Sequence, residues 1–418
     1  MPKKALVRSI DVWNTINRGE EFGASVQNAK LDWPQVMARK DELIGKFVGG
    51  KKPYLKKMGV DYIEGEARFT SPETIQVGDQ EYAAERFLIG TGSVPRLPAI
   101  EGIEWAKTNR DLLNLNPLPK SMVLVGGGVI SLEFAHIYNS VGVDVTILQR
   151  GDVLLRTQDR ETSDIIQAIS EEKGIRVETG VNVQSIAKES EHYVVHYQQG
   201  DHTEQIVTHF VAMNVGRVPK VSGLDLEKAN VEYDEKGISV NAYLQTSNER
   251  IYAGGDCIGG LMLTPKAAYD GKVAVRNAFL GNKEKVDYTL VPHAIFTSPP
   301  VASIGMTEDE ARKKGVAFGT TKVPFTHNGT TILLGEEKGY AKILYEKQTG
   351  RLIGFHMVGV HADDIVHELA IAMRANMTIH ELADVIQVHP TVSEAMIELA
   401  MEGAKHLLDQ KKDEGHLS

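Results

Sequence analysis

The chain has 418 residues, of which 42% are hydrophobic and 24% charged, enough to bury a sizeable core in more than one domain. Its net charge of −10 argues against nucleic acid or an anionic membrane surface as the main partner. No apolar run approaches the length of a membrane span and no secretory apolar segment opens the chain, so a cytoplasmic protein is expected. The single cysteine, Cys257, excludes an internal disulfide framework.

The spacing of apolar residues predicts helices from residue 1 to about 60, then short β segments at 60–69, 74–79 and 87–90. A Pro- and Asn-rich connector at 114–120 precedes a strand, a glycine turn, a helix and a second strand over 122–150. Later strands are expected at 250–256, 338–346 and 351–359, with helices at about 266–279, near 363 and 379, and after 390. This order predicts an α/β protein in which a nucleotide domain is inserted into another domain, followed by an α+β domain.

The segment VLVGGGVISLE at 123–133 follows a predicted strand and opens a predicted helix, as a dinucleotide-binding turn does. Gly126 would form the tight turn, and Gly128 would let backbone amides approach a pyrophosphate at the helix N-terminus. The third small position is Ser131 instead of glycine. The alternative is a glycine turn with no ligand. The candidate nucleotide contacts are Gly126, Gly127, Gly128, Val129 and Ile130.

The end of the second strand indicates which nucleotide is preferred. NAD-binding folds place Asp or Glu there for the ribose hydroxyls, whereas this chain has Gln149 and Arg150, with Arg156 six residues beyond Arg150. Two guanidiniums can pair with a 2′-phosphate, and no carboxylate is present to repel it. NADPH is therefore expected, with a pair of solvated surface arginines as the alternative.

Several separate motifs resemble those of the flavoprotein disulfide reductases, the family of glutathione reductase, trypanothione reductase, dihydrolipoamide dehydrogenase and mercuric reductase. The motifs occur in the family order: MPKKAL at 1–6, GTGSVP at 90–95, GGGVISLE at 126–133, NVGRVP at 214–219, YAGGDC at 252–257, MLTPKAAYDG at 262–271, FTSPPVASIGMTE at 296–308 and HPTVSE at 389–394. The resemblance implies FAD- and NAD(P)-binding Rossmann-like domains plus a C-terminal α+β dimerisation domain. The expected segments are 1–116 and 249–285 for FAD, 117–248 for NAD(P) and 286–418 for dimerisation.

The resemblance also implies roles for individual residues. Glu133 resembles the family glutamate beside the flavin N5, with Lys3 or Lys4 as its lysine partner, and Asp256 resembles the carboxylate that binds ribityl or ribose hydroxyls. The remaining candidate cofactor contacts are Thr91, Gly92, Ser93, Met262, Leu263, Thr264, Pro265, Gly216 and Ala67. Without the resemblance, we would interpret Asp256 as the cap of a turn or helix, and Glu133 as a carboxylate that stabilises a helix N-terminus.

His389 and Glu394 resemble the acid/base pair that family members contribute across a homodimer. A histidine held by a glutamate can move protons for thiol chemistry near neutral pH. The alternative interpretation is that Thr391-x-x-Glu394 forms a capping box for the last helix, with His389 packed against it. His361, Asp364 and His367 fall around a predicted helix instead of on one face, so no metal site is expected.

Family members begin with a first glycine turn for FAD and a C-x-x-x-x-C pair directly before the P-K-K segment, where this chain has Met1. An FAD-dependent oxidoreductase passing electrons from NADPH to a small-molecule disulfide is expected of the intact protein. The chain as written is expected not to reduce disulfides, because a lone thiol cannot form and then resolve a mixed disulfide. The alternatives are an NAD-dependent dihydrolipoamide dehydrogenase and a non-catalytic nucleotide-binding dimer.

Overall fold

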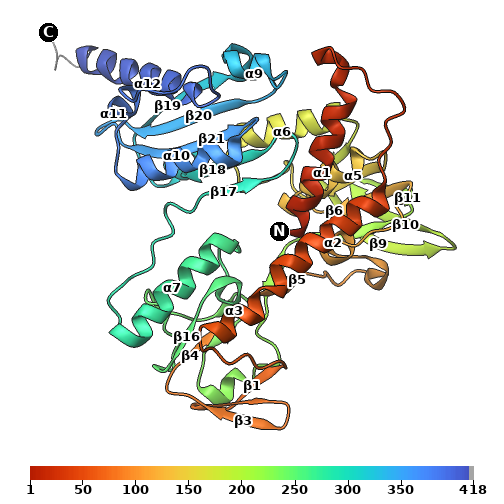
Figure 1. Cartoon of the computed structure of the whole chain (residues 1–418), viewed down its shortest axis with the longest axis vertical. Coiled ribbons are helices and arrows are strands. Elements are labelled where there is room, and N and C mark those ends of the chain that lie inside the picture. Colours follow the sequence, from red (N-terminus) through yellow and green to blue (C-terminus); the bar gives the residue numbers. More distant parts are fainter. Residues whose placement is uncertain (414–418) are drawn as a thin grey trace.

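In the computed structural model, which describes residues 1–413, two long helices precede the first strand (Figure 1). They are α1 (Pro2–Asn17) and α2 (Trp33–Gly49), followed by the short α3 (Lys51–Lys57). Leu6 and Ile10 of α1 and Trp33 of α2 pack into one core with α5, the helix after the glycine turn. The predicted helical start is therefore confirmed, and its apolar stripes are buried against a part of the chain more than a hundred residues further on.

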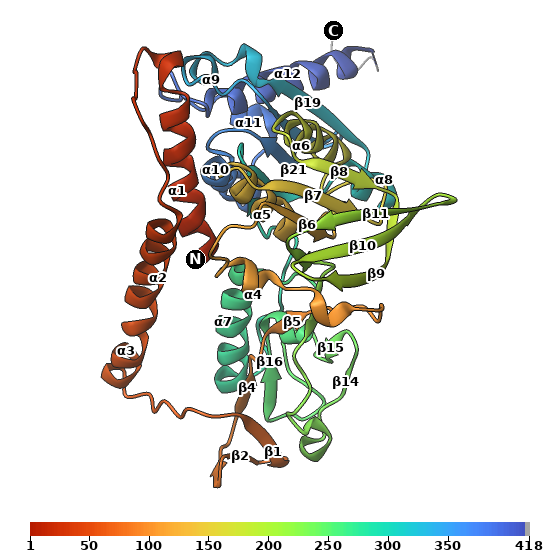
Figure 2. The ribbon, with the colours of Figure 1, turned by 90° about the vertical axis from the view of Figure 1, so that its right-hand side faces the viewer.

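The central part of the chain contains a parallel sheet of order β12-β6-β7-β8. Its elements are β6 (Ser121–Val125), α5 (Val129–Asn139), β7 (Asp144–Gln149), α6 (Arg160–Glu172), β8 (Arg176–Thr179) and β12 (Val211–Met213). An antiparallel meander of β9 (Val181–Glu189), β10 (His192–Gln199) and β11 (His202–Thr208) projects from it (Figure 2). The central strands β6 and β7 consist mostly of buried apolar residues because both faces of the sheet are covered.

Shorter sheets lie at one end of the molecule (Figures 1 and 2). A meander joins β1 (Ala67–Ser71), β2 (Thr74–Val77) and β3 (Gln80–Ala83), while β4 (Phe87–Ile89) pairs in parallel with β16 (Ile251–Ala253). β5 (Ser93–Pro95) pairs antiparallel with β13 (Arg217–Pro219), and β14 (Tyr233–Asp234) with β15 (Gly237–Ile238). Helix α7 (Thr264–Leu280) follows β16 and the short helix η4 (Gly255–Ile258).

The C-terminal part is a five-stranded antiparallel sheet of order β17-β18-β21-β20-β19, which we call the C-terminal module. Its strands are β17 (His293–Ile295), β18 (Val301–Gly305), β19 (Phe318–Pro324), β20 (Tyr340–Glu346) and β21 (Leu352–Val358). Its helices are α8 (Glu308–Lys313), α9 (Gly329–Leu333), α10 (Ala362–Arg374), α11 (Ile379–Ala383) and α12 (Glu394–Asp413). No helix of residues 1–413 is long and apolar enough to cross a membrane.

The strand predicted at 60–69 is confirmed only for residues 67–69. Residues 60–66 run without regular structure, and the strand begins only at Ala67. The side chains of Val60, Tyr62 and Ile63 are exposed, and no other strand in the described chain pairs with this segment. Alternating apolar residues favour an extended chain, but a strand also needs a neighbour to satisfy its backbone groups.

His136 on α5 joins the parallel sheet's layer to the C-terminal module. Its Nδ1 accepts a hydrogen bond from the Ser298 amide at 3.2 Å, and its Nε2 lies 3.0 Å from Ser170 Oγ. Ser170 Oγ itself donates to Ile166 O at 2.6 Å, so Nε2 carries the ring proton and the imidazole is neutral. Burial lowers the pKa of His136 to about 3.

The wild-type protein is therefore expected to lose stability relative to His136→Gln as the pH falls below about 6.5. Unfolded His136 takes up a proton there, whereas the folded ring stays neutral until about pH 3. The glutamine amide offers one acceptor and one donor but does not titrate, so the difference in unfolding free energy should shift by about 1.4 kcal/mol per pH unit. Urea unfolding at pH 7.5 and pH 5.5 measures it, and a pH-independent difference would contradict the neutral assignment.

Candidate functional site

The glycine turn lies between β6 and α5, as predicted. Gly126 has φ +103°, and a Cβ there would lie 2.6 Å from Asn214 O, so only glycine fits. A Cβ at Gly128 would meet no described atom within 4 Å, which leaves open space in front of the helix. Within the described chain no side chain caps the N-terminus of α5, so the amides of Val129 and Ile130 are available to an anion.

Ser131, at the third small position of the fingerprint, is fully buried. Its hydroxyl accepts a hydrogen bond from Asn214 Nδ2 at 3.2 Å, which joins α5 to the end of β12. Serine is therefore satisfied in this position, and close packing of helix on strand is kept. Asn214 was missed as a candidate, although it opens the NVGRVP motif.

Gln149 and the two arginines follow β7, the strand next to the glycine turn. Arg150 and Arg156 are both exposed, and within residues 1–413 neither guanidinium has a hydrogen bond or ion pair. The nearby Asp152 pairs instead with Arg160, at 3.6 Å. The structure thus brings two uncompensated positive charges to the carboxyl end of β7, beside the turn.

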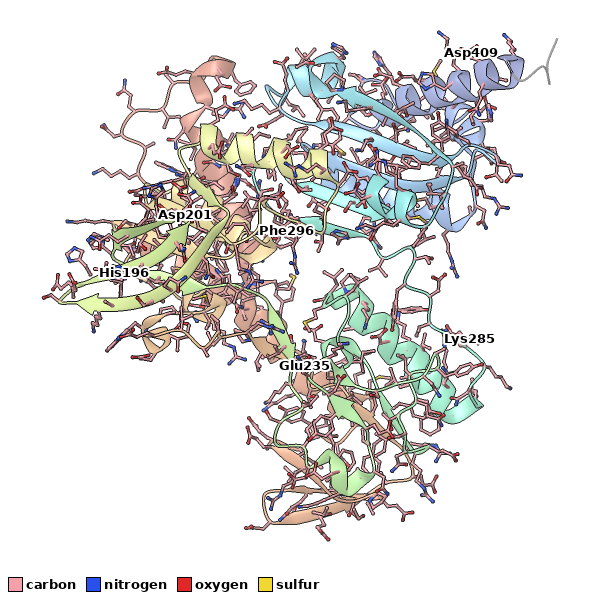
Figure 3. All side chains as sticks on the ribbon, turned by 180° about the vertical axis from the view of Figure 1, so that it is seen from behind. His196, Asp201, Glu235, Lys285, Phe296 and Asp409 are labelled. Carbon is pink, nitrogen blue, oxygen red and sulfur yellow. The ribbon has the colours of Figure 1, made fainter. Side chains whose placement is uncertain are left out.

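Glu133 lies one turn into α5 and is almost completely buried. Its Oε1 accepts a hydrogen bond from the Phe296 amide at 2.9 Å, and its Oε2 pairs with the ammonium of Lys3. Burial lowers the pKa of Lys3 to about 8, and the contact with the Glu133 carboxylate acts in the opposite direction. Figure 3 shows Phe296 where the C-terminal module meets the rest of the molecule.

Of the two candidate lysines, Lys3 is the one beside Glu133. Lys4 pairs with Asp363 of α10 at 2.8 Å, and its ammonium lies 3.9 Å from the centroid of the Phe296 ring. Successive residues of a helix point in directions about 100° apart, so only one of them can face α5. The geometry gives Lys4 a contact between α1 and the C-terminal module instead of one at Glu133.

Asp256 follows β16 and faces a cavity of about 340 Å³. Its Oδ2 accepts a hydrogen bond from Ser93 Oγ at 2.6 Å, and Arg217 donates to Ser93 Oγ and to Ser93 O, both at 2.7 Å. Arg217 was missed, although it follows the predicted contact Gly216. The cavity is lined by Leu88, Ile89, Gly90, Gly92, Gly254, Gly255, Asp256, Met262, Thr264, Ala267 and Gly271.

The other predicted cofactor contacts lie in different places. Met262 and Thr264 line the cavity, and Leu263 and Pro265 lie beside them at the start of α7. Thr91 donates to Lys220 O at 2.7 Å and so holds the chain next to Gly92. Ala67 lies in β1, paired with Val77, and is not among the residues that line the cavity. Cys257 is buried between Ile89 O and Gly254 O, and burial raises the pKa of its thiol.

His389 and Glu394 meet at the start of α12. His389 Nδ1 lies 2.7 Å from Glu394 Oε1, and Glu394 Oε2 accepts a hydrogen bond from the Thr391 amide at 2.8 Å. The bonds to His389 and Thr391 lower the pKa of the Glu394 carboxyl. The His389 side chain is 82% exposed, so its other nitrogen faces outward. Glu394 thus holds the histidine and accepts from the Thr391 amide, but only this half of the expected capping box forms, because α12 begins at Glu394 and Thr391 Oγ donates to Val388 O at 3.0 Å.

Comparison with known proteins identifies the family. Residues 1–271 match the family described as pyridine nucleotide-disulphide oxidoreductase, and residues 291–400 match the dimerisation domain of the same family. The chain belongs to the pyridine nucleotide-disulphide oxidoreductase family. The predicted resemblance, the α/β fold class and the C-terminal dimerisation domain are thereby confirmed, and the protein is an oxidoreductase of a flavin-dependent family.

The alignments with individual relatives cover nearly the whole length of this oxidoreductase. It is 33% identical to a dihydrolipoyl dehydrogenase of Bacillus subtilis (strain 168), over 96% of this chain and 88% of that protein. It is 31% identical to a mercuric reductase of Staphylococcus aureus, over 95% of this chain and 73% of that protein. Among solved structures, the HOCl-induced flavoprotein disulfide reductase RclA from Escherichia coli is 26% identical, with a TM-score of 0.85 over 96% of this chain and 89% of that one.

The residues of this oxidoreductase fit the cofactors of its family. The open space at Gly128 and the uncapped start of α5 suit a pyrophosphate. The cavity beside Asp256 combines a carboxylate, glycine backbone and the uncapped start of α7, which suits a polyhydroxyl chain joined to a flat ring. Asp270, also missed, holds this cavity together: it is fully buried, pairs with Lys266 at 2.6 Å and accepts from the Gly255 amide at 2.8 Å.

Proposed function

We propose that the residues of this chain serve an FAD-dependent oxidoreductase that passes electrons from NADPH to a small disulfide substrate; the dithiol that such chemistry needs is not supplied by these 418 residues, whose one cysteine is Cys257. The choice of NADPH depends on Arg150 and Arg156, which have no partner in the described chain and lie beside the glycine turn. A 2′-phosphate carries negative charge and several acceptor oxygens, two of which a planar guanidinium can bind at once. Gln149 replaces the carboxylate that would bind a free ribose 2′-hydroxyl.

The roles of the residues follow from their positions. The amides of Val129 and Ile130 would bind the pyrophosphate of NADPH, and Asp256 would bind hydroxyls of the flavin side chain. A bound flavin supplies two-electron transfer between the nicotinamide and a disulfide. Lys3 and Glu133 form a fixed ion pair at the start of α5, where the ring of the nicotinamide would lie.

Proton transfer at the disulfide is assigned to His389. Its Nδ1 is held by Glu394, which leaves Nε2 to give a proton to a leaving thiolate and to take one back. Cys257, the one cysteine of the 418 residues, is buried behind Gly254 and takes no part. No residue of this chain is therefore assigned the role of the dithiol that such chemistry needs.

The test is a comparison of NADPH and NADH binding to the wild-type protein. Two charge-assisted pairs of about 1.5–3 kcal/mol each predict that NADPH binds at least about tenfold more tightly. Titration calorimetry of each nucleotide measures the two affinities without any turnover. Equal affinities would remove the support for NADPH.

A second candidate is an NAD-dependent dihydrolipoamide dehydrogenase, which the similarity to dihydrolipoyl dehydrogenases favours. The same titration separates the two candidates, because such an enzyme should bind NADH at least as tightly as NADPH. Charge reversal at position 150 would then leave the preferred nucleotide unaffected.

We further propose that the protein is a homodimer through the C-terminal module. His389 is exposed and shortly precedes α12, and α12 lies at the end of the molecule opposite β16 and α7 (Figures 1 and 2), so we infer that His389 needs a second subunit to meet a flavin site. Large apolar side chains of this module are also exposed, Ile386 at 97% and Val388 at 74%.

Sedimentation is expected to show a dimer at micromolar concentration. Ile386→Lys should raise the monomer fraction, because a charge would have to be buried in the interface. Val207→Lys, on the exposed meander strand β11, is the matched control and should leave the dimer intact. A wild-type monomer at these concentrations would count against the proposal.

A further inference from the structure

The backbone of Gly127, the middle residue of the glycine turn, is tied at both of its polar groups to the segment that follows β7. Its amide donates to Gln149 Oε1 at 2.9 Å, and its carbonyl accepts from the Leu155 amide at 2.9 Å. Neither partner belongs to the turn or to its helix. Residues 149–155 therefore fix the conformation of the turn from outside.

Gln149 uses both ends of its amide. While Oε1 accepts from Gly127, Nε2 donates to Val153 O at 3.0 Å. The side chain thus bridges the glycine turn and residues 150–156, which we call the arginine loop. An amide is required for this bridge, because a carboxylate has no proton to donate to Val153 O and a thioether makes neither bond.

Packing holds the same two segments together. A Cβ at Gly127 would lie 2.6 Å from Leu154 Cδ2 and 3.0 Å from Gln149 Cβ, so the turn and the loop are in close contact. Leu154 and Leu155 are buried at 0% and 3% exposure. Leu155 also has φ +48°, in the left-handed region that side chains other than glycine rarely adopt, so its surroundings must hold it there.

Arg150 and Arg156 stand next to the two anchors. Arg150 directly follows Gln149, and Arg156 directly follows Leu155. We propose that Gln149 is a positioning residue that determines nucleotide specificity by bracing the arginine loop on the glycine turn. The brace fixes the backbone that carries Arg150 and Arg156 relative to the turn, so that one ligand can meet the turn with its pyrophosphate and the arginines with its 2′-phosphate. This inference rests on the proposed function, which assigns NADPH to the same site.

The brace predicts an unequal effect on two fragments of the nucleotide. Gln149→Met keeps the length of the side chain but removes both hydrogen bonds, so the arginine loop loses its fixed position. Binding of adenosine 2′,5′-bisphosphate should weaken by about tenfold, and binding of 5′-AMP, which lacks the 2′-phosphate, by less than about threefold. Gln149→Glu should weaken binding of the bisphosphate further, because the glutamate carboxylate would face Val153 O and would repel the 2′-phosphate.

Calorimetry with both fragments, together with hydrogen exchange of the nucleotide-free protein, tests the inference. Gln149→Met is expected to speed amide exchange in residues 126–128 and 150–156. Gln167→Met, which removes an exposed helix hydrogen bond at 2.9 Å on α6, is the control. It should change neither the amide exchange of these two segments nor the binding of the two fragments. Unchanged exchange, or equal weakening of the two fragments, would overturn the inference. Faster exchange in a protein that binds neither NADPH nor NADH would keep the brace but refute the proposed function.

Discussion

Replacing Arg150 and Arg156 together by glutamate is expected to lower NADPH affinity by about a hundredfold or more and NADH affinity by less than about tenfold. Each charge-assisted pair with a 2′-phosphate contributes about 1.5–3 kcal/mol, and tenfold in affinity corresponds to about 1.4 kcal/mol. The reversed charges would also repel the phosphate. NADH lacks the group that the arginines bind, so its affinity should depend mainly on the turn and α5.

The control is Arg351→Glu, an exposed arginine in the turn between β20 and β21, which should leave both affinities unchanged. Salt provides a second check, because exposed guanidiniums are screened within about 10 Å at 0.1 M ionic strength. The preference of the wild type for NADPH should therefore narrow as salt is raised. A double variant that still preferred NADPH would show that other residues select the nucleotide.

Lys342→Met is expected to destabilise the protein by about 3–5 kcal/mol, because it leaves a buried carboxylate without its cation. The Lys342 ammonium lies 2.5 Å from Asp159 and 2.9 Å from Glu308, and the Lys342 and Asp159 side chains are only 3% and 4% exposed. Burial by itself would raise the pKa of Asp159, but Lys342 reverses this and lowers it. Without the lysine, Asp159 would remain buried and charged at neutral pH.

Urea unfolding of single and double variants tests this prediction. The double variant Lys342→Met/Asp159→Asn should recover most of the lost unfolding free energy, because asparagine can still cap α6 and carries no charge. Lys338→Met, which breaks an exposed pair with Glu172, is the matched control and should cost at most about 1 kcal/mol. The loss in Lys342→Met should also shrink as the pH falls toward 4, because Asp159 can then become neutral. A loss that stays the same at low pH would point to packing as its cause.

The parts of the site that could be predicted from sequence are those whose signal is local. The glycine turn, the two arginines after β7 and the His389–Glu394 pair each lie within one short segment, and the structure places each as its pattern indicates. Their roles stay predictions, but their positions follow from turn and helix geometry alone.

The parts that could not be predicted depend on contacts between distant segments. Choosing Lys3 over Lys4 requires knowing which face of α1 meets α5. The bond from the Phe296 amide to Glu133 joins residues 163 positions apart, and residues 60–66 of the strand expected at 60–69 form no strand because no neighbouring strand pairs with them. Gln149 was read only as a missing carboxylate, because its bond to Gly127 closes across 22 residues.

The bonds of Glu133 have a consequence for motion. This carboxylate is held by Lys3 from α1 and by the Phe296 amide from the C-terminal module, and His136 and Lys342 add further buried bonds across the same junction. Rotating the parallel sheet against the module would break the bonds of the Phe296 amide, His136 and Lys342 together. By contrast, β5 and β13, two of the chain segments that run between the parallel sheet and the Asp256 region, pair with each other over only three residues. If the molecule flexes during a reaction cycle, we expect the hinge at β5 and β13, and the Lys3–Glu133 pair should move as one body with the module.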